Sequence, residues 1–137
     1  MKYNLICKTS ECSTQGSLCV AESQSSEVPF EIKRVYYIYD VHSGVTRGFH
    51  AHKTLQQVLI CVHGKIRITL DDGKNVQNSY ILDSPSSGLY VGPNLWRTME
   101  WIESGSVLLV LASEHYDEAD YIRNYESFID WASRERK

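Results

Sequence analysis

Short runs of strand-forming residues recur along almost the whole 137-residue chain, and turn residues separate one run from the next. The runs cover residues 18–21, 30–39, 47–52, 57–62, 65–70, 79–82, 88–91, 97–102 and 107–111. Gly, Pro, Asp and Ser recur between them, and the Asp72-Gly73 pair predicts a hairpin. Many short strands with regular turns predict an all-β sandwich or barrel, and a chain of this length has room for one hydrophobic core.

The spacing of apolar residues changes near the end of the chain. Between residues 117 and 136 the apolar residues, among them Ile122, Ile129 and Ala132, fall near helical spacing, and charged residues occupy most other positions. Such a pattern predicts an amphipathic helix whose apolar side packs on the barrel. We therefore expect one domain over residues 1–137, all-β with a C-terminal helix at about 117–136.

The composition argues against several classes of protein. The formal net charge is −3 and no basic stripe is present, so we expect neither nucleic acid nor a membrane as a partner. No apolar run approaches the roughly 18 residues of a membrane span, and the first residues do not resemble a signal peptide. The four cysteines form neither Cys-x-x-Cys pairs nor a regular framework, which predicts reduced thiols and a cytoplasmic location.

Two histidines separated by one residue give the strongest functional signal. Side chains alternate between the faces of a strand, so His50 and His52 point to the same side. The apolar run 58–62 follows them, which places the pair on a sheet that faces an enclosed space. A single inward histidine is more often a structural residue, but two at this spacing favour function. Because imidazole titrates near neutral pH, we predict that the pair performs acid–base chemistry.

This region has the spacing of the first sequence motif of the cupin β-barrels. The motif positions are Gly44, His50, His52, residue 57 and Gly64. Metal-binding cupins carry glutamate at position 57 and a further histidine in the second motif, where this chain has Gln57 and Arg97. Glutamine is a weak neutral ligand, and a guanidinium has no lone pair for a metal. Two histidines alone make a poor Zn or Fe site, so we predict neither a metal nor another cofactor.

Two longer strings, Arg47-Gly-Phe-His-Ala-His-Lys53 and Tyr116-Asp-Glu-Ala-Asp-Tyr-Ile-Arg123, carry a closer resemblance. From about residue 15 to about residue 130 the chain resembles the dTDP-4-keto-6-deoxyglucose 3,4-ketoisomerases, the WxcM-like branch of the RmlC-like cupins. The resemblance implies a jelly-roll barrel (double-stranded β-helix) and a metal-free isomerase that acts on a dTDP-sugar. It also implies a homodimer that exchanges N-terminal strands. The 3-keto product would precede a 3-amino-3,6-dideoxyhexose of a surface polysaccharide, such as an O-antigen or S-layer glycan, or of a glycosylated natural product.

The histidines can perform such a reaction. A ketone moves from C4 to C3 when the C3 proton is removed, an enediol forms, C4 is protonated and a proton passes between O3 and O4. We expect His52 to be the carbon base and His50 the relay, although the reverse assignment stays open. The enolate needs a positive charge or a donor nearby, which Arg47 or Tyr37 could supply. Arg47 lies an odd number of residues before both histidines, so it needs a bulge at Gly48 to reach their face.

Further residues are expected around the substrate. We expect contacts from Lys33, Arg34, Gln57 and Arg97. Lys33 and Arg34 could instead be solvated strand residues, and Arg97 could steady the diphosphate at the barrel mouth. The acids of the 117–120 segment are interpreted as first-turn helix residues rather than catalytic groups.

Arg97 also bears on the product. Many family members of the galacto type resemble one another at two positions. A histidine follows the tryptophan, and an arginine precedes a Gly-Ser pair near the start of the chain. This chain has Arg97 after Trp96 and Gln15 before Gly16-Ser17, so we favour the gluco product.

The alternative functions are a galacto-product isomerase, a metal-dependent cupin, a non-catalytic sugar-binding cupin and a 3,5-epimerase. The epimerase depends on a His–Asp dyad that we do not expect around the histidine pair.

Overall fold

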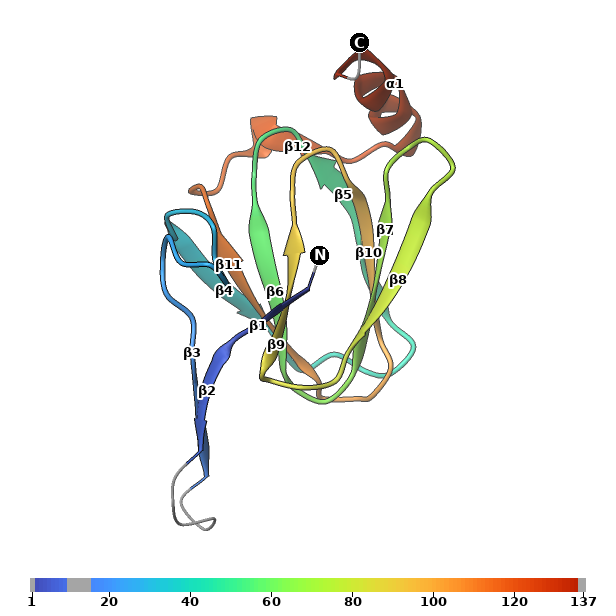
Figure 1. Cartoon of the computed structure of the whole chain (residues 1–137). Coiled ribbons are helices and arrows are strands. Elements are labelled where there is room, and N and C mark those ends of the chain that lie inside the picture. Colours follow the sequence, from blue (N-terminus) through green and yellow to red (C-terminus); the bar gives the residue numbers. More distant parts are fainter. Residues whose placement is uncertain (1, 10–15, 136–137) are drawn as a thin grey trace.

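The computed structural model describes residues 2–9 and 16–135, and it contains two facing antiparallel sheets (Figure 1). The first sheet has the order β1 (Lys2–Asn4), β9 (Ser87–Val91), β6 (Gln57–His63), β11 (Val107–Ala112) and β4 (Arg34–Ile38). The second has the order β12 (Tyr121–Ile122), β5 (Thr46–His52), β10 (Trp96–Trp101), β7 (Ile66–Asp71) and β8 (Gln77–Leu82). A hairpin of β2 (Ile6–Thr9) and β3 (Ser17–Val20) extends away from the two sheets.

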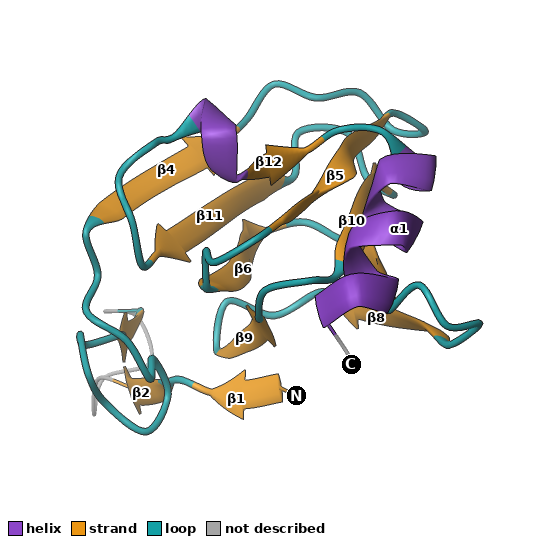
Figure 2. Ribbon diagram, turned by 90° about the horizontal axis from the view of Figure 1, so that it is seen from above, coloured by secondary structure: helices purple, strands orange, loops and turns teal. Residues whose placement is uncertain are grey.

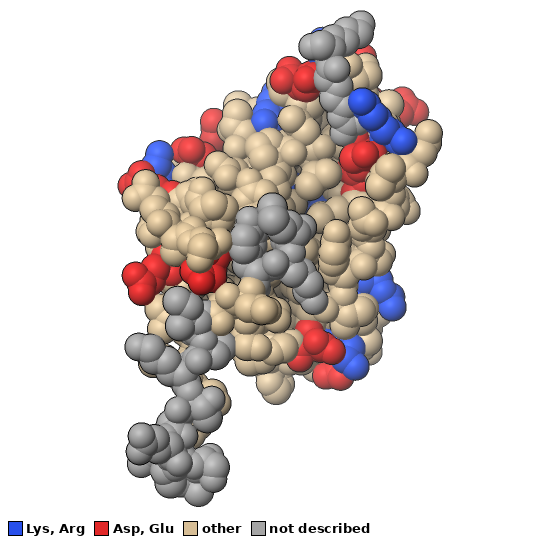
Figure 3. All heavy atoms as spheres, viewed as in Figure 1, with Lys and Arg blue, Asp and Glu red and all other residues tan. Residues whose placement is uncertain are grey.

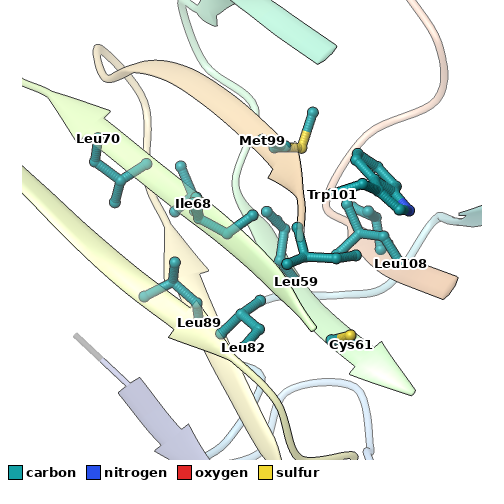
Figure 4. Packing of buried hydrophobic residues seen from close by; sticks show 12 residues of the cluster. Leu59, Cys61, Ile68, Leu70, Leu82, Leu89, Met99, Trp101 and Leu108 are labelled. Carbon is teal, nitrogen blue, oxygen red and sulfur yellow. The ribbon is translucent and has the colours of Figure 1, made fainter. Parts of the chain in front are cut away.

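The main core fills the space between the two sheets. Alternate residues of each strand point inward, because side chains on a strand alternate between its faces. The inward residues are Leu59, Cys61, Leu89, Val91, Leu108 and Val110 of the first sheet and Ile66, Ile68, Leu70, Leu82, Met99 and Trp101 of the second (Figure 4). Each fully buried large side chain contributes about 1.5–3 kcal/mol to stability. The predicted all-β barrel is therefore confirmed.

The outer faces of the sheets have separate covers. Val28 and Phe30, in the segment before β4, pack on Val58 and Ile60 of the first sheet. On the second sheet the cover is the C-terminal helix α1 (Tyr125–Glu135), which lies beside β5 and β10 in the view from above (Figure 2). Phe128 of this helix is fully buried. The expected packing of an amphipathic C-terminal helix on the barrel is thus confirmed.

The helix begins later than the sequence pattern suggested. Asn124 caps its start, because the Asn124 side chain accepts a hydrogen bond from the Ser127 amide at 2.9 Å. The preceding residues form a short 3-10 helix, η2 (Glu118–Asp120), and then β12. Pairing of β12 with β5 overrides the helical spacing of this segment, so the expected start near residue 117 is wrong.

Most predicted strands occur within one or two residues of the expected bounds, and β7 and β8 form the hairpin predicted around Asp72-Gly73. Cys19 is disulfide-bonded, so the expectation of reduced thiols throughout is wrong for this residue. Cys61 is a free thiol buried in β6. Cys12 and the side chain of Cys7 lie outside the described part of the chain.

The surface has no dominant charge on the face shown in Figure 3. Acidic and basic side chains are scattered around a mostly uncharged centre, in agreement with the small net charge. Within residues 2–9 and 16–135, no helix is both long and apolar enough to cross a bilayer.

Candidate active site

A bulge in β5 brings the candidate residues together. Gly48 and Phe49 both have positive φ angles, +96° and +56°. The register with β10 pairs Arg97 with His50 and Thr98 with Gly48, so Phe49 is the extra residue. A Cβ atom on Gly48 would lie 2.9 Å from the Arg97 carbonyl oxygen, which explains the glycine. The bulge predicted from the sequence is therefore confirmed.

The bulge places Arg47 beside His50. Both residues line a cavity of about 330 Å³ that opens between β4 and β5. A second cavity, of about 400 Å³, is lined by His52. Arg34 and Tyr121 line both cavities. Lys33 lines neither cavity and instead pairs with Glu114 at 3.2 Å on the surface.

The two imidazoles form a compact pair. Their ring centroids are 4.9 Å apart and the rings are nearly perpendicular, at 83°. Tyr121 contacts both rings, with centroid distances of 5.1 Å to His50 and 4.3 Å to His52. His52 is only 1% exposed. The two imidazoles therefore lie close together, and His52 is the more deeply buried of the two.

Hydrogen bonds indicate which nitrogen of each ring carries the proton. The Nδ1 atom of His50 lies 3.1 Å from the Gly48 carbonyl oxygen, so it must donate. His52 Nδ1 lies 3.2 Å from a carboxylate oxygen of Asp120. His52 Nε2 is buried and has no hydrogen-bond partner among the described residues. Both rings are thus arranged with Nε2 as the free base.

The contact between His52 and Asp120 corrects the sequence analysis, which expected no His–Asp dyad near the pair. The two residues are 68 positions apart, and the pairing of β12 with β5 brings them together. From the sequence alone, the acidic segment resembles the first turn of a helix. The sequence pattern does not reveal the short strand β12. The pairing of this strand with β5 is what directs Asp120 toward the histidines.

Both imidazoles are neutral bases at physiological pH. Burial lowers the pKa of each ring, and the positive charge of Arg97 lowers it further, to about 4 for His50 and about 2 for His52. Asp120 therefore receives a hydrogen bond from a neutral imidazole rather than forming an ion pair.

Arg97 is a buried cation without a carboxylate partner among the described residues. It is 1% exposed and donates to the side-chain oxygen of Gln57 at 2.5 Å and to the Leu95 carbonyl at 3.1 Å. Burial lowers its pKa to about 10, which leaves it charged at neutral pH. The Gln57 amide in turn donates to the Tyr36 hydroxyl at 3.0 Å.

This network does not fit a metal ion. Arg97 places a positive charge at the position where metal-binding cupins carry a histidine ligand, and Gln57 already accepts its hydrogen bond. Among residues 2–9 and 16–135, no group of three or more His, Cys, Asp or Glu could hold a metal ion.

Tyr37 is not in the site. Its side chain is 62% exposed on the outer face of β4, beside the Tyr39 ring. The side chains of β4 face the opposite sides from those expected, so Tyr36 rather than Tyr37 points into the barrel. Burial raises the pKa of Tyr36, so its hydroxyl stays protonated and can donate. A role for Tyr37 as a donor to the intermediate is therefore wrong for this cavity.

Comparison with known proteins finds relatives over nearly the whole chain. Residues 1–133 match the FdtA family, described as WxcM-like, C-terminal. A TDP-4-oxo-6-deoxy-alpha-D-glucose-3,4-oxoisomerase of Aneurinibacillus thermoaerophilus is 53% identical over 121 residues, which is 88% of this chain and 86% of that protein.

Solved structures agree in fold. A mutant of the 3,4-ketoisomerase QdtA from Thermoanaerobacterium thermosaccharolyticum, in complex with TDP-4-keto-6-deoxyglucose, is 44% identical with a TM-score of 0.90, over 98% of this chain and 94% of that one. The Campylobacter jejuni TDP-quinovose 3,4-ketoisomerase WlaRB is 48% identical with a TM-score of 0.87, over 95% and 96%. The TDP-fucose-3,4-ketoisomerase WlaRA of the same species is 32% identical, over 96% and 94%, also with a TM-score of 0.87. The chain belongs to the WxcM-like family of sugar 3,4-ketoisomerases, within the cupin fold.

Proposed function

We propose that this protein converts TDP-4-keto-6-deoxyglucose into the 3-keto isomer by proton transfer, without a metal or other cofactor. The observation that carries this proposal is the pair of neutral histidines, His50 half-buried and His52 fully buried, beside the uncompensated cation Arg97. Relatives that match nearly the whole chain are 3,4-ketoisomerases of TDP-sugars, which supports the same substrate class.

The reaction can be followed atom by atom. His52 Nε2 takes the proton from C3, and the electrons of that bond form a C3–C4 double bond while the C4 oxygen becomes an enolate. A proton from the solvent adds to C4 on the opposite face of the ring, as the gluco product requires, while the protonated His52 releases its proton to the solvent. O3 becomes the carbonyl oxygen as its proton passes to O4. His50, whose Nδ1 donates to the Gly48 carbonyl, relays this oxygen proton through Nε2. No electrons enter or leave the substrate overall, so the reaction needs no redox partner.

Arg97 is the group that stabilises the enolate. A buried charge acts more strongly than an exposed one, because the surrounding medium screens it less. Arg47, the donor expected from the sequence, is exposed at the cavity edge, so it is better placed for the diphosphate, together with Arg34. Gln57 acts on the substrate only through Arg97 and Tyr36.

Incubation of the protein with TDP-4-keto-6-deoxyglucose tests both whether the isomerisation occurs and which product forms. We expect the gluco 3-keto sugar, because the chain carries Arg97 and is more similar to the quinovose isomerase than to the fucose isomerase, at 48% against 32% identity. Quinovose is 6-deoxyglucose and fucose is 6-deoxygalactose. Gln15, the second residue behind this expectation, lies outside the described part of the chain. A large H4–H5 proton coupling in the product marks the gluco form, and a small coupling would contradict it.

We also propose that the protein is a homodimer with exchanged N-terminal strands. β4 is an edge strand, and its outer face exposes Val35 and Tyr37, next to Tyr39, while Leu18 of the protruding hairpin is exposed as well. An apolar edge of this kind is usually covered by a second chain. Within this chain β1 pairs with β9, and exchange would replace that pairing by the same strand of the partner.

Sedimentation at micromolar concentration should give a dimer for this protein. Tyr37→Lys places a charge on the exposed face of β4, so we expect it to shift the equilibrium toward monomer. Val76→Lys changes an equally apolar exposed residue in the turn between β7 and β8 and should leave the dimer intact. A monomeric parent protein would contradict the proposal. The cytoplasmic location stays a prediction.

A further inference from the structure

We infer that Asp120 is a positioning residue, which holds His52 in the tautomer that leaves Nε2 unprotonated. The effect of this tautomer on catalysis rests on the proposed function. Asp120 is the last residue of η2, directly before β12, and lies far from the histidines in sequence. It does not touch the candidate carbon base atom itself. Its effect on the reaction would pass entirely through the ring of His52.

The surroundings of Asp120 make it an acceptor. One carboxylate oxygen accepts from the amide and the hydroxyl of Thr54, both at 2.8 Å. The other accepts from the Leu55 amide at 3.3 Å and faces His52 Nδ1 at 3.2 Å. Both carboxylate oxygens thus act as acceptors, with three donors other than the imidazole directed at them.

An ionised carboxylate dictates the proton position on the neighbouring ring. With the proton on Nδ1, His52 donates to Asp120 and leaves the Nε2 lone pair free. With the proton on Nε2, the Nδ1 lone pair would face a carboxylate oxygen at 3.2 Å, which is repulsive. Nε2 is buried without a hydrogen-bond partner among the described residues, so nothing on that side opposes the first arrangement.

β12 fixes the orientation of the ring as well. The register pairs Tyr121 with His52, and the Tyr121 ring lies against the imidazole at a centroid distance of 4.3 Å. Asp120 holds one edge of the ring and Tyr121 restricts its rotation. The segment that appeared to be the start of a helix thus positions the proposed base from two sides.

Asp120→Asn tests the inference. The single amide oxygen is needed by the amide and hydroxyl of Thr54, so the NH2 group faces His52 Nδ1 and donates to it. His52 then carries its proton on Nε2, where it cannot act as a base. We expect turnover to fall by about 10²–10⁴, the usual effect of a wrong tautomer, with little change in KM. Nitrogen-15 NMR of labelled histidine should show two changes in this variant. The chemical shift of His52 Nδ1 should move to the value of an unprotonated nitrogen, and that of Nε2 to the value of a protonated one.

Two control variants separate this effect from loss of structure. Thr54→Val keeps the carboxylate but removes one of its donors, so the His52 tautomer should stay as in the parent protein. Asp130→Asn removes an exposed carboxylate on α1, with no contact to the histidines, and should leave turnover unchanged. The nitrogen-15 spectrum is recorded on variants whose thermal unfolding shows that they are folded.

An unchanged His52 tautomer in Asp120→Asn, or normal turnover despite an exchanged tautomer, would overturn the inference. The tautomer is measured without substrate. If the parent protein failed to isomerise the sugar, the proposed function would fail, while the spectrum would still show whether Asp120 sets the proton position.

Discussion

His52→Asn should lower turnover by about 10² or more, the usual contribution of a positioned general base, while the fold and nucleotide binding persist. An asparagine side chain can still reach Asp120, but it carries no basic atom at the position of Nε2. His50→Asn should lower turnover by a similar factor, because the relay of the oxygen proton depends on His50 Nε2. Steady-state kinetics with TDP-4-keto-6-deoxyglucose and calorimetric titration with TDP measure the two effects separately.

His63→Asn is the matched control for these substitutions. His63 lies exposed at the end of β6, away from both cavities, so its replacement should leave turnover unchanged. Near-normal turnover in both His50→Asn and His52→Asn would refute the assignment of the pair.

The second large effect is expected from a single negative charge in the barrel. Gln57→Glu places a carboxylate beside Arg97, where the amide oxygen now accepts a hydrogen bond at 2.5 Å. The new ion pair would neutralise the Arg97 charge, which we assign to stabilisation of the enolate. We therefore expect turnover to fall by about 10², the usual effect of removing one hydrogen-bond donor that stabilises an oxyanion. Substrate affinity should change less, because the ground-state ketone carries no full charge.

The same substitution should change the pH profile. In the parent protein, burial and the Arg97 charge lower the pKa of His50 to about 4, so the neutral base persists as the pH falls well below 7. A carboxylate beside Arg97 cancels part of that repulsion and raises the pKa of both histidines. The variant should therefore lose its remaining activity at a higher pH than the parent does as the solution is acidified.

Gln56→Glu provides the control for Gln57→Glu. The Gln56 side chain accepts a hydrogen bond from Tyr90, on the outer face of the first sheet, so a charge there should leave turnover and its pH dependence unchanged. Parent-like turnover in Gln57→Glu would show that Arg97 does not stabilise the intermediate.

Local patterns in the sequence predicted much of the fold and half of the site. Strands with clear alternation and turn residues were found within one or two residues, and the glycine before the histidines correctly indicated the bulge that brings Arg47 to their side. These features depend on neighbouring residues, so local spacing is enough to predict them. The histidine pair belongs to the same class, because two residues on one strand must share a face.

The missed features depend on contacts between distant segments. β4 carries aromatic residues at both parities, so nothing local shows whether Tyr36 or Tyr37 faces the core. Asp120 enters the site only because β12 pairs with β5, and a two-residue strand gives no periodicity from which to predict it. The role of Arg97 was also incomplete, since its burial and its contact with Gln57 follow from the register of β10 against the other strands.

Incubation of the protein with TDP-4-keto-6-deoxyglucose in deuterium oxide, followed by proton NMR, tests the central claim most directly. Proton transfer through an enediol predicts a 3-keto product that carries solvent deuterium at C4, with His52→Asn slowing both the isomerisation and the labelling. A substrate that keeps its 4-keto form and gains no deuterium at C3 or C4 would contradict the account.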